Sequence, residues 1–131
     1  MNDKCPCQTG ESYAVCCQAI IEGKKEAKTA EALMRSRYTA YVLADINYLL
    51  NSHHPSTRPS KDRKKILKWA KSMEWKGLEI LACMHGKEDD TKGWVEFKAS
   101  YLEEGEPQEI HENSVFVKES GRWYYQDGEH F

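Results

Sequence analysis

The sequence lacks long apolar runs: 40% of its 131 residues are hydrophobic and its mean hydropathy is −0.78. A membrane-spanning helix needs about 20 consecutive, predominantly apolar residues, so membrane insertion is excluded. The first four residues lead straight into cysteines, without the apolar stretch of a secretory signal. We therefore expect a cytoplasmic protein in a reducing compartment.

Several catalytic signatures are also missing. The sequence shows no Ser-His-Asp order of a hydrolase, no glycine-rich phosphate loop and no histidine triad for a catalytic metal. It has no internal repeat and no low-complexity tract, and its length suits one domain with an appendage. These absences favour a non-enzymatic role over a recognisable reaction.

Cysteine is the unusual presence. Four of the 5 cysteines fall between positions 5 and 17, and Cys83 stands alone. The first 18 residues contain only Tyr13 and Val15 as large apolar side chains. Two such groups cannot offset the cost of ordering the backbone, about 1–2 kcal/mol per residue. Another interaction must therefore fold this segment.

The spacing Cys5-Pro6-Cys7, then Cys16-Cys17, favours a metal. Adjacent cysteines have Cα atoms about 3.8 Å apart, closer than disulfides usually allow. Cross-paired disulfides or redox thiols are an alternative, which a reducing compartment disfavours. Four thiolates complete a tetrahedral shell around zinc, which binds with about 10–16 kcal/mol, and iron is the other metal such a site admits. A closed shell leaves no position for an activated water, so the site would be structural.

Apolar spacing predicts helices in the first half of the remaining chain. A helix is expected at about residues 30–44, with Thr29 as its cap. A second, short helix runs from Ile46 to Leu50 and ends before Pro55, which disfavours helical geometry in the preceding residue. A third helix follows Pro59. We expect these helices to form one layer.

After Trp75 the apolar period changes to two, which predicts strands. The expected strands lie near residues 78–83, 95–101, 108–118 and 122–127. Short connections imply an antiparallel meander. Helices followed by strands indicate an α+β fold in which the helices cover the concave face of a curled sheet. The first strand is expected to be buried on both faces, with Cys83 as an inert core residue.

The net charge of −2 hides an asymmetry, because residues 1–77 carry about +6 and residues 78–131 about −8. The third helix concentrates positive charge on one face, formed by Lys61, Lys64, Lys65 and Lys68. This face is either the solvated side of an amphipathic helix or a contact for a polyanion such as RNA or ribosomal phosphate.

The segment from Cys5 to Cys17, CPCQTGESYAVCC, resembles the SEC-C motif. That motif is a zinc knuckle also found at the C-terminus of the SecA preprotein-translocase motor, where it implies contacts with proteins or ribosomes. Three further segments, residues 33–41, His54-Pro55 and residues 121–128, resemble the YchJ-like family of uncharacterised bacterial proteins. Some members carry a second cysteine knuckle at the end, which this chain lacks, so one zinc ion is expected.

The family resemblance implies two units: a zinc knuckle over residues 1–22, and over residues 23–131 a domain like nuclear transport factor 2 and ketosteroid isomerase. Such cones usually contain a pocket between the long helix and the sheet. The candidate pocket residues are Arg35, Arg37, Tyr38, Tyr41, His54, Glu112 and Ser114. Glu112 beside an inward arginine would form an acid-base pair, a ligand clamp or a buried ion pair.

Three functional interpretations follow. The leading one is a zinc-binding interaction module whose knuckle docks a protein or the ribosome, with a candidate ligand pocket in the cone. The second is an enzyme of the ketosteroid-isomerase type, with Glu112, Tyr41 or His54 as acid or base. The third is RNA or ribosome binding through the basic helix and the knuckle.

Overall fold

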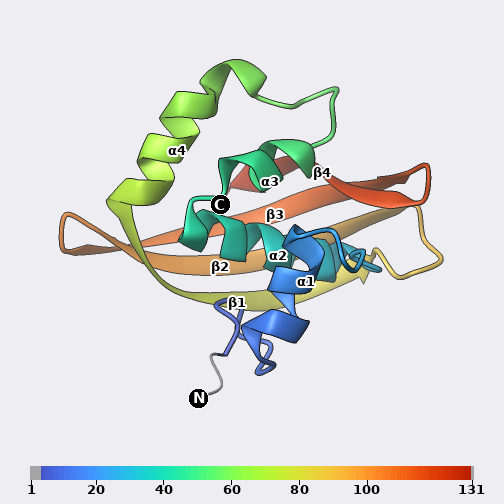
Figure 1. The fold of residues 1–131 in the computed structure, drawn as a ribbon, viewed down its shortest axis with the longest axis horizontal. Helices are drawn as coiled ribbons and strands as arrows, with labels where there is room; N and C mark the ends of the chain where they lie inside the picture. Colours follow the sequence, from blue (N-terminus) through green and yellow to red (C-terminus); the bar gives the residue numbers. More distant parts are fainter. Residues whose placement is uncertain (1–3, 131) are drawn as a thin grey trace.

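Four antiparallel strands form the sheet of the computed structural model, which describes residues 4–130 (Figure 1). They are β1 (Met73–His85), β2 (Lys92–Glu103), β3 (Glu106–Glu119) and β4 (Arg122–His130), paired in chain order. The predicted meander is therefore confirmed. The ends of the two predicted units, residues 1–3 and residue 131, lie outside the described residues.

Two tight turns fix the register of the last three strands. Glu104-Gly105 joins β2 to β3, and Ser120-Gly121 joins β3 to β4; all four residues have φ between 52° and 82°. Two-residue turns of this left-handed kind match the twist of a hairpin, and glycine adopts the required angles without strain. The turn sets the pairing of β3 with β4 as far as Phe116, and a register shift between Val115 and Phe116 displaces the pairing beyond it by one residue.

Three helices cover one face of the sheet (Figure 1). They are α2 (Ala30–Leu43), α3 (Ile46–Asn51) and α4 (Arg63–Ser72), and a 3₁₀ turn at Ser60–Asp62 precedes α4. Thr29 Oγ1 accepts a hydrogen bond of 3.0 Å from the Ala32 amide, and Asp45 Oδ1 accepts one of 3.1 Å from Tyr48. These two caps stabilise the first turns of α2 and α3. The predicted helices are confirmed.

The core lies between α2 and the sheet. Leu33, Met34 and Tyr38 of α2 pack against buried side chains of the strands, which include Val95, Phe97, Phe116 and Trp123. The Trp123 indole donates a hydrogen bond of 3.1 Å to the Lys28 carbonyl. In the part of the chain that the structure describes, no helix is long and apolar enough to cross a membrane.

The segment before α2 packs onto the same core. It contains a 3₁₀ turn (Tyr13–Val15) and the short helix α1 (Cys17–Ile21). The four clustered cysteines are buried in one cluster with Leu33 and Met34. The knuckle therefore rests directly on the cone.

The strand β1 corrects two expectations. It begins at Met73, and its end is not buried on both faces: residues 81–85 are all exposed, with Met84 at 60%. Cys83 is exposed too, so its expected place in the core was wrong. The reason is that β1 is an edge strand, with a neighbouring strand on one side only. Alternation alone does not distinguish such a strand from a central one.

Candidate metal centre and cone cavity

The knuckle turns back on itself through a tight loop. The Cys5 amide donates to the Glu11 carbonyl (2.8 Å), the Gln8 amide donates to the Cys5 carbonyl (3.0 Å), and Gly10 has a φ of 92°. This fold brings the pair Cys5 and Cys7 to the pair Cys16 and Cys17. All four side chains are buried, and their sulfurs lie within 4.8 Å of one another.

The sulfur spacing fits a tetrahedral metal. Metal–sulfur bonds of about 2.3 Å place tetrahedral sulfurs about 3.8 Å apart. The Cys7 and Cys16 sulfurs are 3.6 Å apart, and the Cys16 and Cys17 sulfurs are 4.0 Å apart. The donor set of four thiols and its size therefore suit a closed site for a soft cation.

Electrostatics within the cluster concentrates negative charge on one sulfur. A hydrogen bond from Cys17 and others from Thr9 lower the pKa of the Cys7 thiol. The reciprocal bond to Cys7 raises the pKa of Cys17, and burial raises that of Cys16. Only a cation would favour thiolates at every position.

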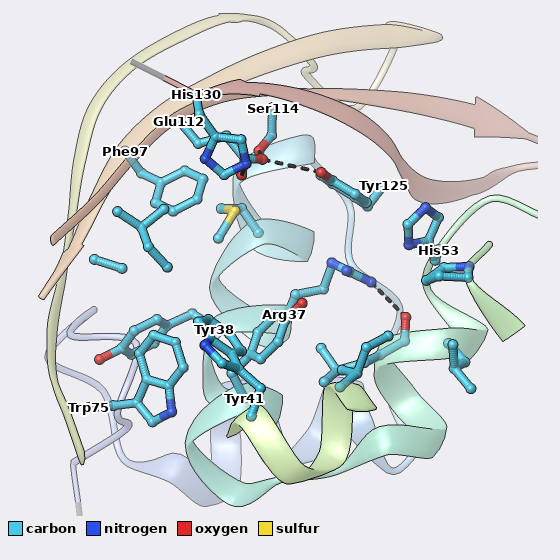
Figure 2. A pocket seen from close by; sticks show the side chains of 18 residues that line it. Arg37, Tyr38, Tyr41, His53, Trp75, Phe97, Glu112, Ser114, Tyr125 and His130 are labelled. Atoms are coloured by element: carbon cyan, nitrogen blue, oxygen red, sulfur yellow. Dashed lines mark hydrogen bonds and ion pairs between the residues drawn. The ribbon is translucent and has the colours of Figure 1, made fainter. Parts of the chain in front are cut away.

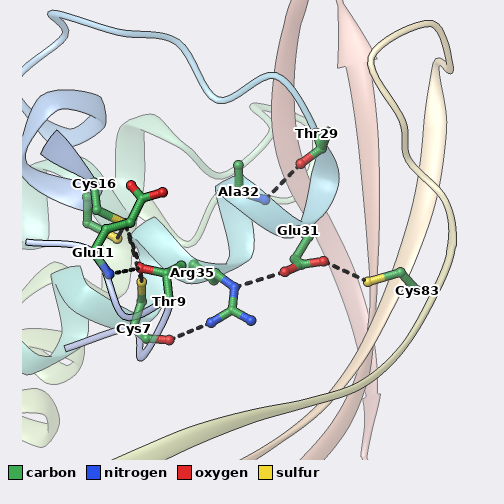
Figure 3. Close-up of polar contacts among 10 residues, drawn as sticks. Cys7, Thr9, Glu11, Cys16, Thr29, Glu31, Ala32, Arg35 and Cys83 are labelled. Carbon is green, nitrogen blue, oxygen red and sulfur yellow. Dashed lines mark hydrogen bonds and ion pairs between the residues drawn. The ribbon is translucent and has the colours of Figure 1, made fainter. Parts of the chain in front are cut away.

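A polar chain ties the knuckle to the cone (Figure 3). Arg35 donates to the Cys7 carbonyl (2.6 Å) and to a Glu31 oxygen (2.9 Å), and the other Glu31 oxygen accepts from Cys83 (3.5 Å). Burial, followed by the charge of Glu31, raises the pKa of Cys83 to about 11. That thiol is therefore protonated at neutral pH, although it is exposed.

Arg35 of α2 thus contacts the knuckle and does not line the cavity, contrary to the prediction. Residues 34, 37, 38 and 41 share the inward face of α2 at the helical repeat, and position 35 lies off that face. A second tie is the Gln8 side chain, whose oxygen accepts from the Leu78 amide of β1 at 2.6 Å.

A cavity of about 280 Å³ opens between the helices and the sheet (Figure 2). Its aromatic wall consists of Tyr38, Tyr41, Trp69 and Trp75. The Trp75 ring centroid lies 5.4–6.0 Å from those of the other three, in edge or tilted arrangements. Such contacts make a firm apolar surface. The Trp75 indole nitrogen itself is sealed and has no hydrogen-bond partner among the described residues.

Glu112 forms the acidic corner of the cavity. One carboxylate oxygen accepts from the Ser114 hydroxyl and from the Tyr125 hydroxyl (3.2 Å), and the other lies 3.2 Å from the His130 Nε2 (Figure 2). A Cβ atom at Gly128 on the neighbouring strand would collide with this carboxylate. Glycine at that position therefore leaves room for the acid.

Arg37 forms the basic corner and is only 5% exposed. Its Nη1 donates to the Leu49 carbonyl (2.8 Å) and to the Ser52 hydroxyl (2.6 Å). Its guanidinium carbon lies 4.5 Å from the ring centroid of Tyr125. Burial raises the pKa of Tyr125, and the charge of Glu112 adds to the effect. Within residues 4–130, Arg37 and Glu112 make no direct ion pair; Tyr125 contacts both of them instead.

Of the two histidines before Pro55, the structure places His53 and not the predicted His54 at the cavity. His54 makes an ion pair with Glu119 and a hydrogen bond with Ser56 (2.8 Å), and it does not line the cavity, contrary to the prediction. His53 does line it, and its ring lies edge-on to Tyr125 with centroids 4.9 Å apart. Burial, helped by the charge of Arg37, lowers the pKa of His53 to about 4.

The structure places Arg37, Tyr38, Tyr41, Glu112 and Ser114 together at the cavity. Sequence reasoning missed the following lining residues: His53, Trp69, Trp75, Tyr125 and His130. His130 lies directly opposite Glu112 in the register of β3 and β4. A simple hairpin alignment through Ser120-Gly121 would place Glu129 opposite Glu112. The register shift between Val115 and Phe116 moves His130 into that position, so no local sequence signal identifies it.

The predicted basic face, formed by α4 and the 3₁₀ turn before it, points to solvent. Lys61, Lys64, Lys65 and Lys68 are exposed, and none makes an ion pair with another residue of the described chain. The opposite side of the helix packs through Ile66 against a small cluster that includes Tyr48 and Leu49. The geometry leaves this basic face free for solvent or for an anionic partner.

Comparison with known families matches both parts of the chain. Residues 29–128 match the YchJ middle NTF2-like domain, and residues 1–19 match the SEC-C motif. A UPF0225 protein of Geobacter sulfurreducens is 46% identical over 128 residues, which cover 98% of this chain and 80% of the relative. One from Chromobacterium violaceum is 44% identical over 124 residues, covering 95% and 90% respectively.

Two solved structures share the fold. The solution structure of a SEC-C motif containing protein from Rhodopseudomonas palustris superposes with a TM-score of 0.87, at 35% identity and 98% coverage of both chains. The crystal structure of a SEC-C motif containing protein from Psychrobacter arcticus gives a TM-score of 0.81 at 36% identity, covering 94% of this chain and 80% of that one. The α+β cone with an N-terminal cysteine cluster is thus a shared architecture.

Proposed function

We infer that this chain, which belongs to the UPF0225 family, is a zinc-stabilised interaction module of the cytoplasm. It combines the SEC-C motif with the YchJ-type NTF2-like domain. The observation that carries this proposal is the buried cluster of four cysteine sulfurs, all within 4.8 Å. Cys5, Cys7, Cys16 and Cys17 would hold one zinc ion.

The closed donor set supports a structural role for the metal. Four thiolates fill a tetrahedral shell, so water or substrate finds no coordination position. The cysteines are at most 9% exposed, which further separates the ion from solvent. The zinc would therefore shape a surface.

That surface would be the knuckle together with the groove beside it. Val15 stands 58% exposed on the 3₁₀ turn between the cysteine pairs. A groove of about 370 Å³ lies between the knuckle and the start of α2, lined by Thr9, Cys16 and Arg35 among others. An apolar tip beside a polar groove suits a protein partner, either free or on the ribosome.

Metal analysis tests the first half of the proposal. Protein purified without added metal should carry about one equivalent of zinc by mass spectrometry, and a chelator should release it with loss of knuckle structure. Less than about half an equivalent of zinc, with four free thiols and an unchanged fold, would contradict it.

Quantitative affinity capture tests the second half. A partner held by the knuckle should be lost both from a Cys16→Ser, Cys17→Ser protein and from Val15→Asp, which leaves the metal ligands intact. Leu43→Asp, at a 49% exposed residue of α2, is the matched surface control and should retain the partner. Equal capture by all four proteins would remove the proposed interaction surface.

A second candidate function, binding of RNA through α4, is favoured by the four exposed and unpaired lysines. The affinity for single-stranded RNA should fall as salt is added. A plot of the logarithm of the binding constant against the logarithm of the salt concentration should have a slope of about −0.7 for each phosphate neutralised. Replacing all four lysines with glutamate should abolish it, whereas replacing Lys87 and Lys92 should not. Absent or salt-independent binding would exclude this candidate.

A further inference from the structure

Arg37 places a buried positive charge in the cavity, and some of its hydrogen-bond donors have no partner among the described residues. A guanidinium has five N–H donors. The two on Arg37 Nη1 serve Leu49 and Ser52, and the three on Nε and Nη2 have no hydrogen-bond partner among residues 4–130. No carboxylate of the described chain makes an ion pair with Arg37. A buried cation in this state favours an anionic ligand.

Glu112, the acid at the other corner, already has partners for both of its carboxylate oxygens. Glu112 accepts from Ser114 and Tyr125, and it pairs with His130. Tyr125 occupies the space between the two charges, with its hydroxyl on Glu112 and its ring against Arg37. The charge available to a ligand in this cavity is therefore positive.

The third titratable group near the guanidinium does not compete for the anion or neutralise it. His53 faces the same space, and burial and the charge of Arg37 keep it neutral at pH 7. It can give or take a hydrogen bond with the ligand, and it adds no charge. Arg37 alone thus sets the polarity of this end.

The opposite end suits a flat apolar group. Tyr41, Trp69 and Trp75 surround it with ring faces and edges, and Phe97 and Ile110 close it from the sheet. The volume of about 280 Å³ lies just below the range of about 300–1,000 Å³ that drug-sized ligands occupy. The occupant should therefore be a small molecule with one ring system.

We propose that the cone cavity binds a small aromatic monocarboxylate, with its carboxylate on the Nε and Nη2 groups of Arg37 and its ring against Tyr41, Trp69 and Trp75. A planar carboxylate matches the fork of these donors in a bidentate arrangement. The site shares no residue with the cysteine cluster, so it stands or falls independently of the proposed zinc and its partner.

Three probes that share one fused ring system, indole, and differ in charge test the proposal by calorimetry on the full chain. Indole-3-acetate is the anion, indole-3-acetamide the neutral analogue of the same shape, and tryptamine the cation. We expect saturable binding of the acetate, at least about tenfold tighter than that of the amide, since charge-assisted hydrogen bonds are about twice as strong as neutral ones. Equal or tighter binding of the amide or tryptamine, or no binding of the acetate up to about 10 mM, would overturn it.

Nuclear magnetic resonance locates the bound probe. The chain has 4 tryptophans, of which Trp69 and Trp75 line the cavity whereas Trp94 and Trp123 do not. The acetate should shift the indole N–H signals of Trp69 and Trp75 and the side-chain N–H signal of Arg37. Shifts confined to Trp94 and Trp123 would place the probe elsewhere and refute the assignment.

Arg37→Met removes the charge, and Arg63→Met is the control at an exposed arginine outside the cavity. We expect Arg37→Met to weaken acetate binding by about ten- to a hundredfold and to leave amide binding nearly unchanged, with no change in Arg63→Met. A folded Arg37→Met protein that binds the acetate like the parent would overturn the proposal. Because Arg37 also ties α2 to α3, the three-probe series on the parent protein decides the question if this variant does not fold.

Discussion

The knuckle and the cone are built around different kinds of buried side chain. In the knuckle the buried groups are four cysteines in a loop held by short backbone hydrogen bonds. In the cone they are large apolar side chains of α2 and the sheet, such as Phe116 and Trp123. One unit depends on the chemistry of sulfur, and the other depends on the removal of apolar surface from water. Substitutions in one unit should therefore leave the other largely unaffected.

Loss of one sulfur should have the largest effect. Cys7→Ser removes a fully buried member of the cluster, and zinc binding in such sites is worth about 10–16 kcal/mol. We expect the metal content to fall below half an equivalent and the amides of residues 5–21 to exchange rapidly, while the cone stays folded. Cys83→Ser is the control and should keep its metal. Full metal retention in Cys7→Ser would show that the knuckle does not depend on its four sulfurs.

Truncation of a core side chain should have the next largest effect, and it should lower the stability of the cone. Phe116→Ala removes a side chain with no exposed surface, and such changes cost about 3–5 kcal/mol. Chemical denaturation should show this loss, with the zinc content unchanged. Leu81→Ala, at a 39% exposed residue of β1, should cost little. A loss of zinc in Phe116→Ala would mean that the two units are not independent.

The contact between the units should be worth less. Gln8→Ala leaves the Leu78 amide without its partner, and an unsatisfied buried donor costs about 1–3 kcal/mol. The loss should appear in the unfolding of the cone, although the substitution is made in the knuckle. Gln18→Ala serves as the control, because that side chain bonds only the exposed Glu22. Equal stability of the two variants would show that the Gln8 bond contributes nothing.

The smallest effect should come from pH. The pKa of His53 is lowered from 6.5 to about 4 in the folded state, so between these values the unfolded chain binds more protons. Stability should therefore be fully present above pH 6.5. A shift of this size corresponds to about 3 kcal/mol at most, and solvent screening of the partly exposed ring reduces the expected loss to about 1–2 kcal/mol as the pH drops to 4. Denaturation of His53→Gln should show a shallower pH dependence than that of the parent. Identical profiles for the two proteins would contradict the assignment.

The elements of the fold were predictable because local signals specify them. Thr29 and Asp45 cap the helices where the pattern places them, and Ser120-Gly121 fixes a hairpin by its backbone angles. The exposure of Cys83 was not predictable, since an edge strand and a central strand share the same alternation. Burial depends on what covers a strand, which the strand itself does not encode.

The cavity was only partly predictable, for a related reason. Helical spacing identifies Arg37, Tyr38 and Tyr41 as one face, whereas adjacent residues such as His53 and His54 can be assigned only once the chain path is known. His130 joins Glu112 across two strands, and its role depends on their register. The cysteine cluster was accessible from sequence because all four positions lie within one short loop.

The Gln8 side chain connects residues 70 positions apart, while the metal site itself is built within 13 residues. During synthesis, residues 5–17 emerge well before β1, and chains grow at about 5–20 residues per second. The sulfur site can thus close on the nascent chain seconds before its docking strand is made. The knuckle can then meet β1 as a finished part, and the bond to Leu78 can form before the other three strands are made.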